Sequence, residues 1–367
     1  MRKPAAKARS KPDIAADRAA PRVPHPRETT AFAGHERAEA DFMRAIAHER
    51  LHHAWLLTGE KGIGKATFAY RAARFLLRGG EAVAQGGGGL HTPPDHPISR
   101  QIAAGAHPSL FVLERSTARA SGTIAVEDVR GLVSFLRHTS STARRVVIVD
   151  TADDLTGAAA NALLKGVEEP PPGTVFLLAS RTASGVLPTI RSRCAALAFR
   201  ALHGEAFATA VTTACRLGGL DEPDAKAMRD LERHAGGSPG RALAQMAAGG
   251  VQLAHEIDAL FSLLPKLDET RLHALIAAAT FRAEDRFDTV CDLIEENLER
   301  QLVMRVESGA SQAQGGQSLA RIAELWEKLR ERRRETDALN LDKASFLLLT
   351  FRDLATLDRP AATASMR

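Results

Sequence analysis

The chain has 367 residues, 44% of them hydrophobic, which is enough to bury large cores in two or three domains. It has no run of about 18 apolar residues and no apolar signal segment, so we expect neither a membrane protein nor a secreted one, but a cytoplasmic protein. The cysteines at 194, 215 and 291 are too widely spaced for a zinc knuckle, and we expect reduced thiols.

The net charge of +5 comes from the N-terminus. Residues 1–27 contain eight Lys or Arg and two Asp, a net charge of +6, so the remainder of the chain sums to −1. We expect a disordered basic tail over residues 1–24. A transit peptide is disfavoured because Asp13, Asp17 and several prolines interrupt any amphipathic helix, and a DNA-binding protein is an alternative that rests on this tail alone.

The first predicted elements after the tail follow the order helix, strand, glycine loop, helix. Apolar residues at helical spacing, Ala38, Phe42 and Ile46, predict the first helix, and the strand AWLLT leads directly into GEKGIGKAT at 59–67. A helix is expected from Lys65 to the Gly79-Gly80 pair. Residues 79–108 are rich in Gly, Pro and His without a period, which predicts an inserted loop.

The next hundred residues alternate between apolar runs and amphipathic helical patterns. This alternation predicts an α/β fold, a parallel sheet covered by helices on both faces. Beyond Phe199 only helical patterns remain, interrupted by a Gly/Gln/Ser loop at 308–318. The expected division is an α/β domain at 25–200, a helical lid at 201–249, an all-α domain at 250–358 and a tail at 359–367.

The stretch at 59–67 fits G-x-x-x-x-G-K, in which backbone amides converge on phosphate oxygens and the lysine reaches the outer phosphates. The alternative, a tight turn without a ligand, is disfavoured by the strand before it and the helix after it. Asp150 ends the apolar run RVVIVD and supplies the acidic half of such a site. The expected nucleotide-binding residues here are Gly59, Gly62, Gly64, Lys65, Ala66, Thr67 and Asp150.

Two groups needed for hydrolysis are missing. Ala66 stands where a Ser or Thr hydroxyl binds Mg²⁺, and Thr67 is rotated away by about 100°. Thr151 stands where a glutamate activates water, and Asp153 and Asp154 are expected to be a helix cap and a solvated charge. Slow or absent hydrolysis is therefore expected, with weak binding of ATP or ADP, preferably ADP.

Several stretches together carry a family resemblance. They include RVVIVDTADDLTG, EEPPPGT, LPTIRSRC and GGSPGRAL, and with the altered glycine loop they resemble the delta-prime subunits of the bacterial DNA polymerase III clamp loader, which are AAA+ proteins. The resemblance runs from about Phe32 to Leu357. It implies an AAA+ P-loop domain, a small helical lid and a C-terminal collar domain.

This resemblance also implies a function in DNA replication. The chain would be a non-hydrolysing member of a hetero-oligomeric ring, with motor and delta-type subunits as partners and with the sliding clamp and primed DNA reached through the complex. Arg193 would act in trans on a neighbour's ATP, the alternative being a surface salt bridge, and Arg241 would be the lid arginine that contacts nucleotide. No cofactor is required. The rival prediction is an active AAA+ ATPase motor in replication or repair.

Three further patterns have simpler explanations. Gly236, Ser238 and Gly240 match a hydrolase nucleophile turn, but no strand precedes them. The segment where relatives carry a zinc module has no cysteine, so no zinc is expected from its histidines, which are His91, His96 and His107. The basic run at 330–335 is expected to be a solvated helix face with ion pairs to flanking glutamates, although contact with DNA is an alternative.

Overall fold

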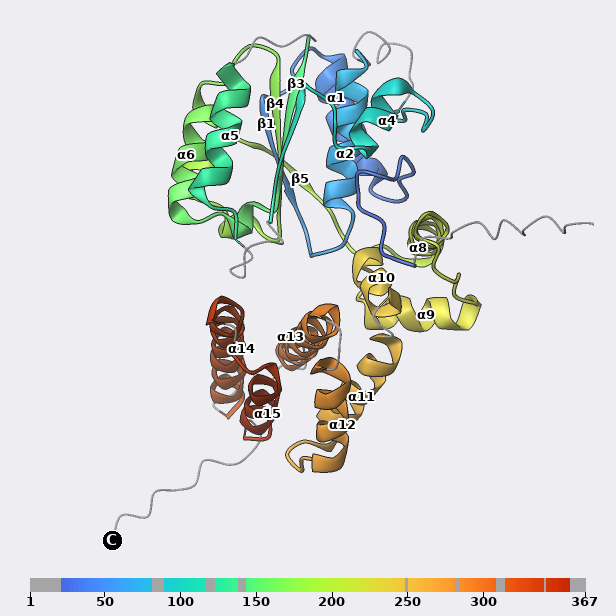
Figure 1. Ribbon diagram of the computed structural model, residues 1–367, viewed down its shortest axis with the longest axis vertical. Coiled ribbons are helices and arrows are strands. Elements are labelled where there is room, and N and C mark those ends of the chain that lie inside the picture. The colour runs from blue at the N-terminus through green and yellow to red at the C-terminus, as the bar shows by residue number, and fades with distance from the viewer. Residues whose placement is uncertain are drawn as a thin grey trace, which may run out of the picture.

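The computed structural model describes residues 21–80, 89–115, 123–137, 143–247, 250–280, 284–307, 314–339 and 341–356. Within them, a parallel sheet between helices is followed by helices alone, which confirms the predicted α/β fold with a helical C-terminal part (Figure 1). The strands are β1 (Ala54–Thr58), β2 (Leu110–Glu114), β3 (Arg145–Asp150), β4 (Thr174–Ser180) and β5 (Ala195–Ala198). The basic tail at 1–24 lies almost entirely outside the described residues, and the tail at 359–367 lies wholly outside them.

The helices of the α/β part are α1 (Glu36–Ala47), α2 (Lys65–Leu77), α4 (Pro97–Ala103), α5 (Val126–Arg137), α6 (Gly157–Glu168) and α7 (Pro188–Arg191), with short 3₁₀ turns η1 (Ala152–Asp154) and η2 (Ala183–Gly185). Those that follow are α8 (Gly204–Gly218), α9 (Ala225–His234), α10 (Pro239–Ala247), α11 (Gly250–Leu263), α12 (Glu269–Thr280), α13 (Glu284–Glu307), α14 (Gln314–Leu339) and α15 (Lys343–Leu354).

The sheet has the strand order β2-β3-β4-β1-β5, and every pairing is parallel. Strand β1 is therefore an inner strand, since Leu57 pairs with Ala179 of β4 on one side and with Leu197 of β5 on the other. All strands end at the same edge, so the glycine loop after β1 emerges beside the ends of β3 and β4. This arrangement places the candidate site at the carboxyl edge of the sheet.

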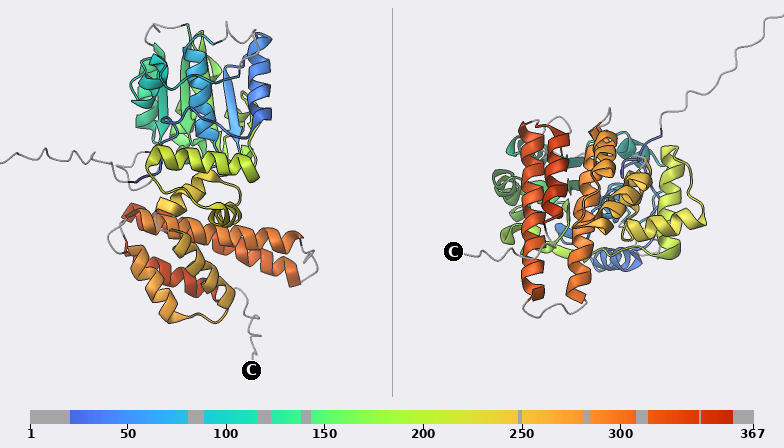
Figure 2. Two further views of the ribbon diagram at one scale, coloured as in Figure 1. Left: turned by 90° about the vertical axis from the view of Figure 1, so that its right-hand side faces the viewer. Right: turned by 90° about the horizontal axis from the view of Figure 1, so that it is seen from below.

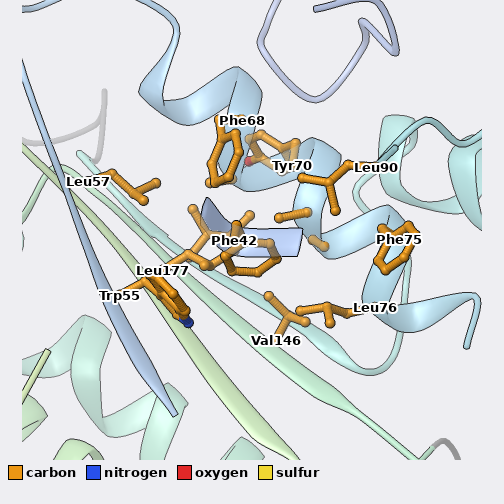
Figure 3. Packing of buried hydrophobic residues seen from close by; sticks show 14 of the residues in the cluster. Phe42, Trp55, Leu57, Phe68, Tyr70, Phe75, Leu76, Leu90, Val146 and Leu177 are labelled. Atoms are coloured by element: carbon orange, nitrogen blue, oxygen red, sulfur yellow. The ribbon is translucent and has the colours of Figure 1, made fainter. Parts of the chain in front are cut away.

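Alternate residues of each strand enter different cores. Leu57 of β1 packs with α1, α2 and α4 on one face, where the rings of Phe42, Trp55 and Phe68 meet (Figure 3). The centroid of Phe42 is 5.0 Å from that of Trp55 and 5.6 Å from that of Phe68. Leu56 enters the opposite core, beneath α5 and α6. Strands buried on both faces explain why the sequence shows continuous apolar runs.

Three elements differ from the sequence prediction. Strand β5 was missed because its sequence, Ala-Ala-Leu-Ala, has no β-branched or aromatic residue. Helix α4 lies inside the segment predicted as a loop; Pro97 begins it and the His96 side chain accepts a bond from the Ile98 amide. Helix α14 begins at Gln314, within the predicted loop at 308–318, whose first six residues are outside the described part of the chain.

The helical part contains two further hydrophobic clusters. One is formed by α8, α9 and α10, around Phe207 and Val211. The other is formed by α11 to α15, and Figure 2 shows the long helices α13 and α14 side by side within it. The predicted boundaries at 201 and 250 remain a proposal, which these separate clusters support. None of the helices in the described residues is long and apolar enough to cross a bilayer.

We predict that Phe68→Ala lowers the free energy of unfolding of the α/β part by about 3–5 kcal/mol, because a fully buried ring leaves a cavity among other rings. The chain has two tryptophans, so a Trp326→Phe background leaves Trp55, in the same core, as the fluorescent reporter of urea unfolding. Val133→Ala on α5, whose side chain is exposed, is the control and changes stability by less than about 0.5 kcal/mol. Equal effects of both substitutions would contradict this packing.

Candidate functional site: an altered nucleotide-binding loop

The backbone of the glycine loop follows the path that phosphate binding requires. Gly62 and Gly64 have φ values of 77° and 109°, in the region that favours glycine. Gly64 is the residue before α2 and has no side chain to cap it, so the first amides of that helix face outward for an anion. The structure thus brings Gly59, Gly62, Gly64 and the start of α2 together as the sequence predicted.

Lys65 is turned back onto its own loop. Its ammonium group donates hydrogen bonds to the carbonyl oxygens of Gly59 and Glu60, each at 2.6 Å, and the residue is only 5% exposed. Burial lowers the pKa of Lys65 to about 8, although the nearby carboxylates of Asp150 and Asp153 oppose this shift. A phosphate at the loop would therefore have to compete with two carbonyl oxygens for this cation.

Asp150 lies at the end of β3, at the same edge of the sheet, as predicted. Burial raises the pKa of its carboxyl group, while the charge of Lys65 acts in the opposite direction. In the first turn of α2, Ala66 offers only a methyl group, so the hydroxyl that completes a Mg²⁺ site is missing. Within the described residues no group of three or more His, Cys, Asp or Glu is arranged to hold a metal ion.

The carboxylates nearest to Thr151 are already engaged. The Thr151 hydroxyl donates to Asp154 at 3.0 Å, and the guanidinium of Arg115 lies 3.6 Å from the same carboxylate. Asp153 accepts the hydroxyl of Ser180 at 2.9 Å and the amide of Arg181 at 2.8 Å. The prediction of a helix cap and a solvated charge was wrong, because Asp153 joins the end of β4 to the turn after β3. Both carboxylates are thus bound to groups of the chain itself.

Helix α10 brings Arg241 to the loop. The guanidinium Nη1 lies 3.1 Å from Glu60 and 3.9 Å from Glu296 of α13. Ser238 is fully buried and its hydroxyl donates to the carbonyl of Lys61 at 2.8 Å. This burial agrees with rejecting a hydrolase nucleophile at Ser238, whose hydroxyl holds the lid to the loop.

Arg193 follows α7 on the other side of the α/β part. It is 40% exposed, forms an ion pair with Glu168 at 2.9 Å, and donates to the Thr189 carbonyl at 2.8 Å. The next residue, Cys194, packs into the core beneath α6, and burial raises the pKa of its thiol to about 11. A half-buried cysteine thus follows Arg193, whose own bonds are to α6 and α7 and not to the glycine loop of the chain.

The basic run at 330–335 forms ion pairs with other helices. Arg332 lies 2.6 Å from Asp353 of α15, and Arg333 lies 2.8 Å from Asp292 of α13. For Arg332 and Arg333 the predicted solvated face was wrong, since both arginines lie against neighbouring helices.

The predicted loop histidines have structural contacts as well. His96 caps α4, and the buried His107 accepts the amide of Ser109 at 3.1 Å.

We predict that Lys65→Met removes a pH dependence of stability between pH 8 and 10.5. The unfolded chain binds this proton up to pH 10.5 and the folded chain only to about 8, so the free energy of unfolding of the wild type rises with pH across that window, by up to about 3 kcal/mol. Unfolding followed by Trp55 fluorescence checks this. A difference between the two proteins that stays constant across the window would contradict it.

Known proteins are similar to this chain in sequence. The family described as "DNA polymerase III, delta subunit" matches residues 34–203. Among curated proteins, the delta' subunit of DNA polymerase III from Pseudomonas aeruginosa is 42% identical over 200 residues, covering 51% of this chain and 53% of that protein. The delta' subunit of Escherichia coli K12 is 37% identical over 159 residues, which are 42% and 45% of the two chains.

Other proteins similar to this chain are gamma-type subunits of DNA polymerase III. The gamma/tau subunit of DNA polymerase III from Mycobacterium bovis is 34% identical over 212 residues, covering 56% of this chain and 34% of that protein. A solved gamma subunit-related protein from Thermotoga maritima aligns with a TM-score of 0.45 at 18% identity, over 88% of this chain and 100% of that one.

The chain spans about half the length of the delta' proteins that it matches. The family match falls on the part that carries the sheet, the glycine loop and Arg193. Residues 34–203 thus match this family, and the curated relatives include delta' subunits, in agreement with the resemblance of the motifs to delta-prime clamp-loader subunits.

Proposed function

We propose that the chain is a non-hydrolysing clamp-loader subunit that supports a hetero-oligomeric ring and provides Arg193 to the ATP of a neighbouring subunit. The observation that carries the proposal is the combination of Ala66 and Thr151 with the bonds already made by Asp153 and Asp154. A metal-binding hydroxyl and a general base are both missing, and the two neighbouring aspartates are held by other groups. Loss of a general base alone costs about 10²–10⁴-fold in rate.

The partners follow from this proposal. They are motor and delta-type subunits of the same loader in the bacterial cytoplasm, with the sliding clamp and primed DNA reached through the assembled complex. The loop amides and Lys65 retain weak affinity for ATP or ADP, preferably ADP, because its β-phosphate does not need a metal bridge to a γ-phosphate. Neither a metal nor any other cofactor is required for the supporting role.

The exposure of Arg193 supports its role in trans. A guanidinium that is 40% exposed and held by one surface carboxylate, Glu168, can exchange that partner for a phosphate group at little cost, because exposed ion pairs contribute about 0–1 kcal/mol. Its bond to the Thr189 carbonyl and the half-buried neighbour Cys194 limit the positions that it can reach. An arginine so placed makes hydrolysis by the neighbour depend on assembly.

A second function, an active ATPase motor, is favoured by the similarity to the gamma/tau subunit. We expect the purified chain to show no ATP hydrolysis above background with Mg²⁺, with or without primed DNA, because both missing groups act in the chemical step. The measurement is steady-state phosphate release, and Lys65→Ala is the blank for contaminating ATPases. Turnover in the range of about 1 s⁻¹ that disappears in Lys65→Ala would establish the motor and exclude the supporting role.

We predict that Arg193→Ala in a reconstituted loader lowers hydrolysis at the one neighbouring site by about 10³-fold or more, because the developing charge on the phosphate loses its cation. The DNA-stimulated ATPase rate of the whole complex then falls by the fraction of hydrolysis that this one site contributes. Arg191→Ala is the matched control, since this arginine is exposed on the same short helix and donates to the Ala183 carbonyl. Assembly, checked by gel filtration, should be intact in both variants. An unchanged rate in Arg193→Ala would refute the trans role.

A further inference from the structure

Residues 60–62 of the glycine loop contact helices from the C-terminal half of the chain. The Lys61 carbonyl accepts the hydroxyl of Ser238, and the Gly62 carbonyl accepts the amide of Gly240, both at 2.8 Å. These bonds use carbonyl oxygens, whereas a phosphate is held by amides. The carbonyl oxygens of Lys61 and Gly62 are therefore bound by the chain itself.

The side chain of Lys61 extends the contact to α13. Its ammonium donates to one oxygen of Asp292 at 2.6 Å, and the other oxygen of the same carboxylate accepts from Arg333 of α14 at 2.8 Å. The partly buried position of Asp292 opposes its ionisation, but the two cations outweigh this effect and lower the pKa of the carboxyl group to about 2. One permanently charged carboxylate thus joins the loop, α13 and α14.

Arg241 provides a second contact between the loop and α13. Glu296 lies one helical turn after Asp292, so both carboxyl groups share a face of α13. Arg241 of the lid lies between Glu296 and Glu60 of the loop, at 3.9 Å and 3.1 Å. Burial raises the pKa of Glu296 to about 7, so this carboxyl group is only partly charged near neutral pH, whereas Asp292 stays fully charged.

The ion pair of Lys61 with Asp292 is strengthened by the bonds around it. The side chains of Lys61 and Asp292 are 49% and 42% exposed, and an isolated ion pair with such exposure contributes little. Here the lid also donates two hydrogen bonds to carbonyl oxygens of the same loop. In addition, Asp292 is paired with the largely buried Arg333, which also binds Glu295 at 3.1 Å. Charges that form a network of this kind contribute more than separate surface pairs.

We propose that residues 60–62 are the junction that fixes the orientation of the lid and the helices α11 to α15 relative to the sheet. The loop holds the lid through its carbonyl oxygens and α13 through Lys61, so it keeps a structural role without the groups for hydrolysis. The helical part lies beyond the carboxyl edge of the sheet, where this junction makes contact with it (Figure 1). This role does not depend on whether the chain hydrolyses ATP or acts on a neighbour.

Hydrogen exchange measured by mass spectrometry on the full chain tests the junction. Lys61→Met removes the charge from the loop but leaves the pair of Asp292 with Arg333 in place, so α13 should remain folded. We expect faster exchange, by about threefold or more, both in peptides of the loop and in peptides of α13 around residue 292. Asp292→Asn should give the same two changes, and the double variant no more than the larger single effect.

Glu299→Gln is the control on the same helix, because this glutamate is exposed and lies one turn beyond Glu295, outside the contacts with the loop. Its exchange pattern should equal that of the wild type in both segments. Thermal unfolding of each variant verifies that the chain is folded. If Lys61→Met changes only the loop peptides, or if the effects of the two substitutions add in the double variant, the loop and α13 are independent and the junction is refuted.

Discussion

The approach of two backbones at Gly62 and Gly240 determines how the rest of the molecule is arranged. A Cβ atom on Gly240 would lie 2.6 Å from the Cα of Gly62, and one on Gly62 would lie 2.6 Å from the hydroxyl oxygen of Ser238. Neither position has room for a side chain, so at this point the two backbones touch directly. Since the loop begins at the inner strand β1, this contact sets where Lys61 and Arg241 can reach.

The sequence predicted the elements whose patterns are local. Strands such as RVVIVD, buried on both faces, show as apolar runs, and the glycines and Lys65 at the end of β1 mark the loop without knowledge of the fold. Strand β5 has no such pattern, and only its pairing with β1 makes it a strand. The parallel arrangement of the sheet could thus be anticipated from the sequence, whereas the edge strand β5 could not.

The candidate site, like the sheet, could be predicted from the sequence only in part. Asp150 ends its strand, so its place at the sheet edge could be inferred from the sequence. The bonds of Asp153 to Ser180 and Arg181 depend on the neighbouring strand, and the contact of Lys61 with Asp292 joins residues that are 231 positions apart. Helical periodicity shows that Asp292 and Glu296 share a face, but it does not reveal what that face contacts.

The burial of Cys194 has a consequence for the chemical durability of the adjoining arginine segment. Peroxides and electrophiles attack the thiolate form of cysteine, and the pKa of about 11 keeps this sulfur protonated at cellular pH. The thiol next to Arg193 therefore reacts slowly with oxidants, because little of it is in the thiolate form.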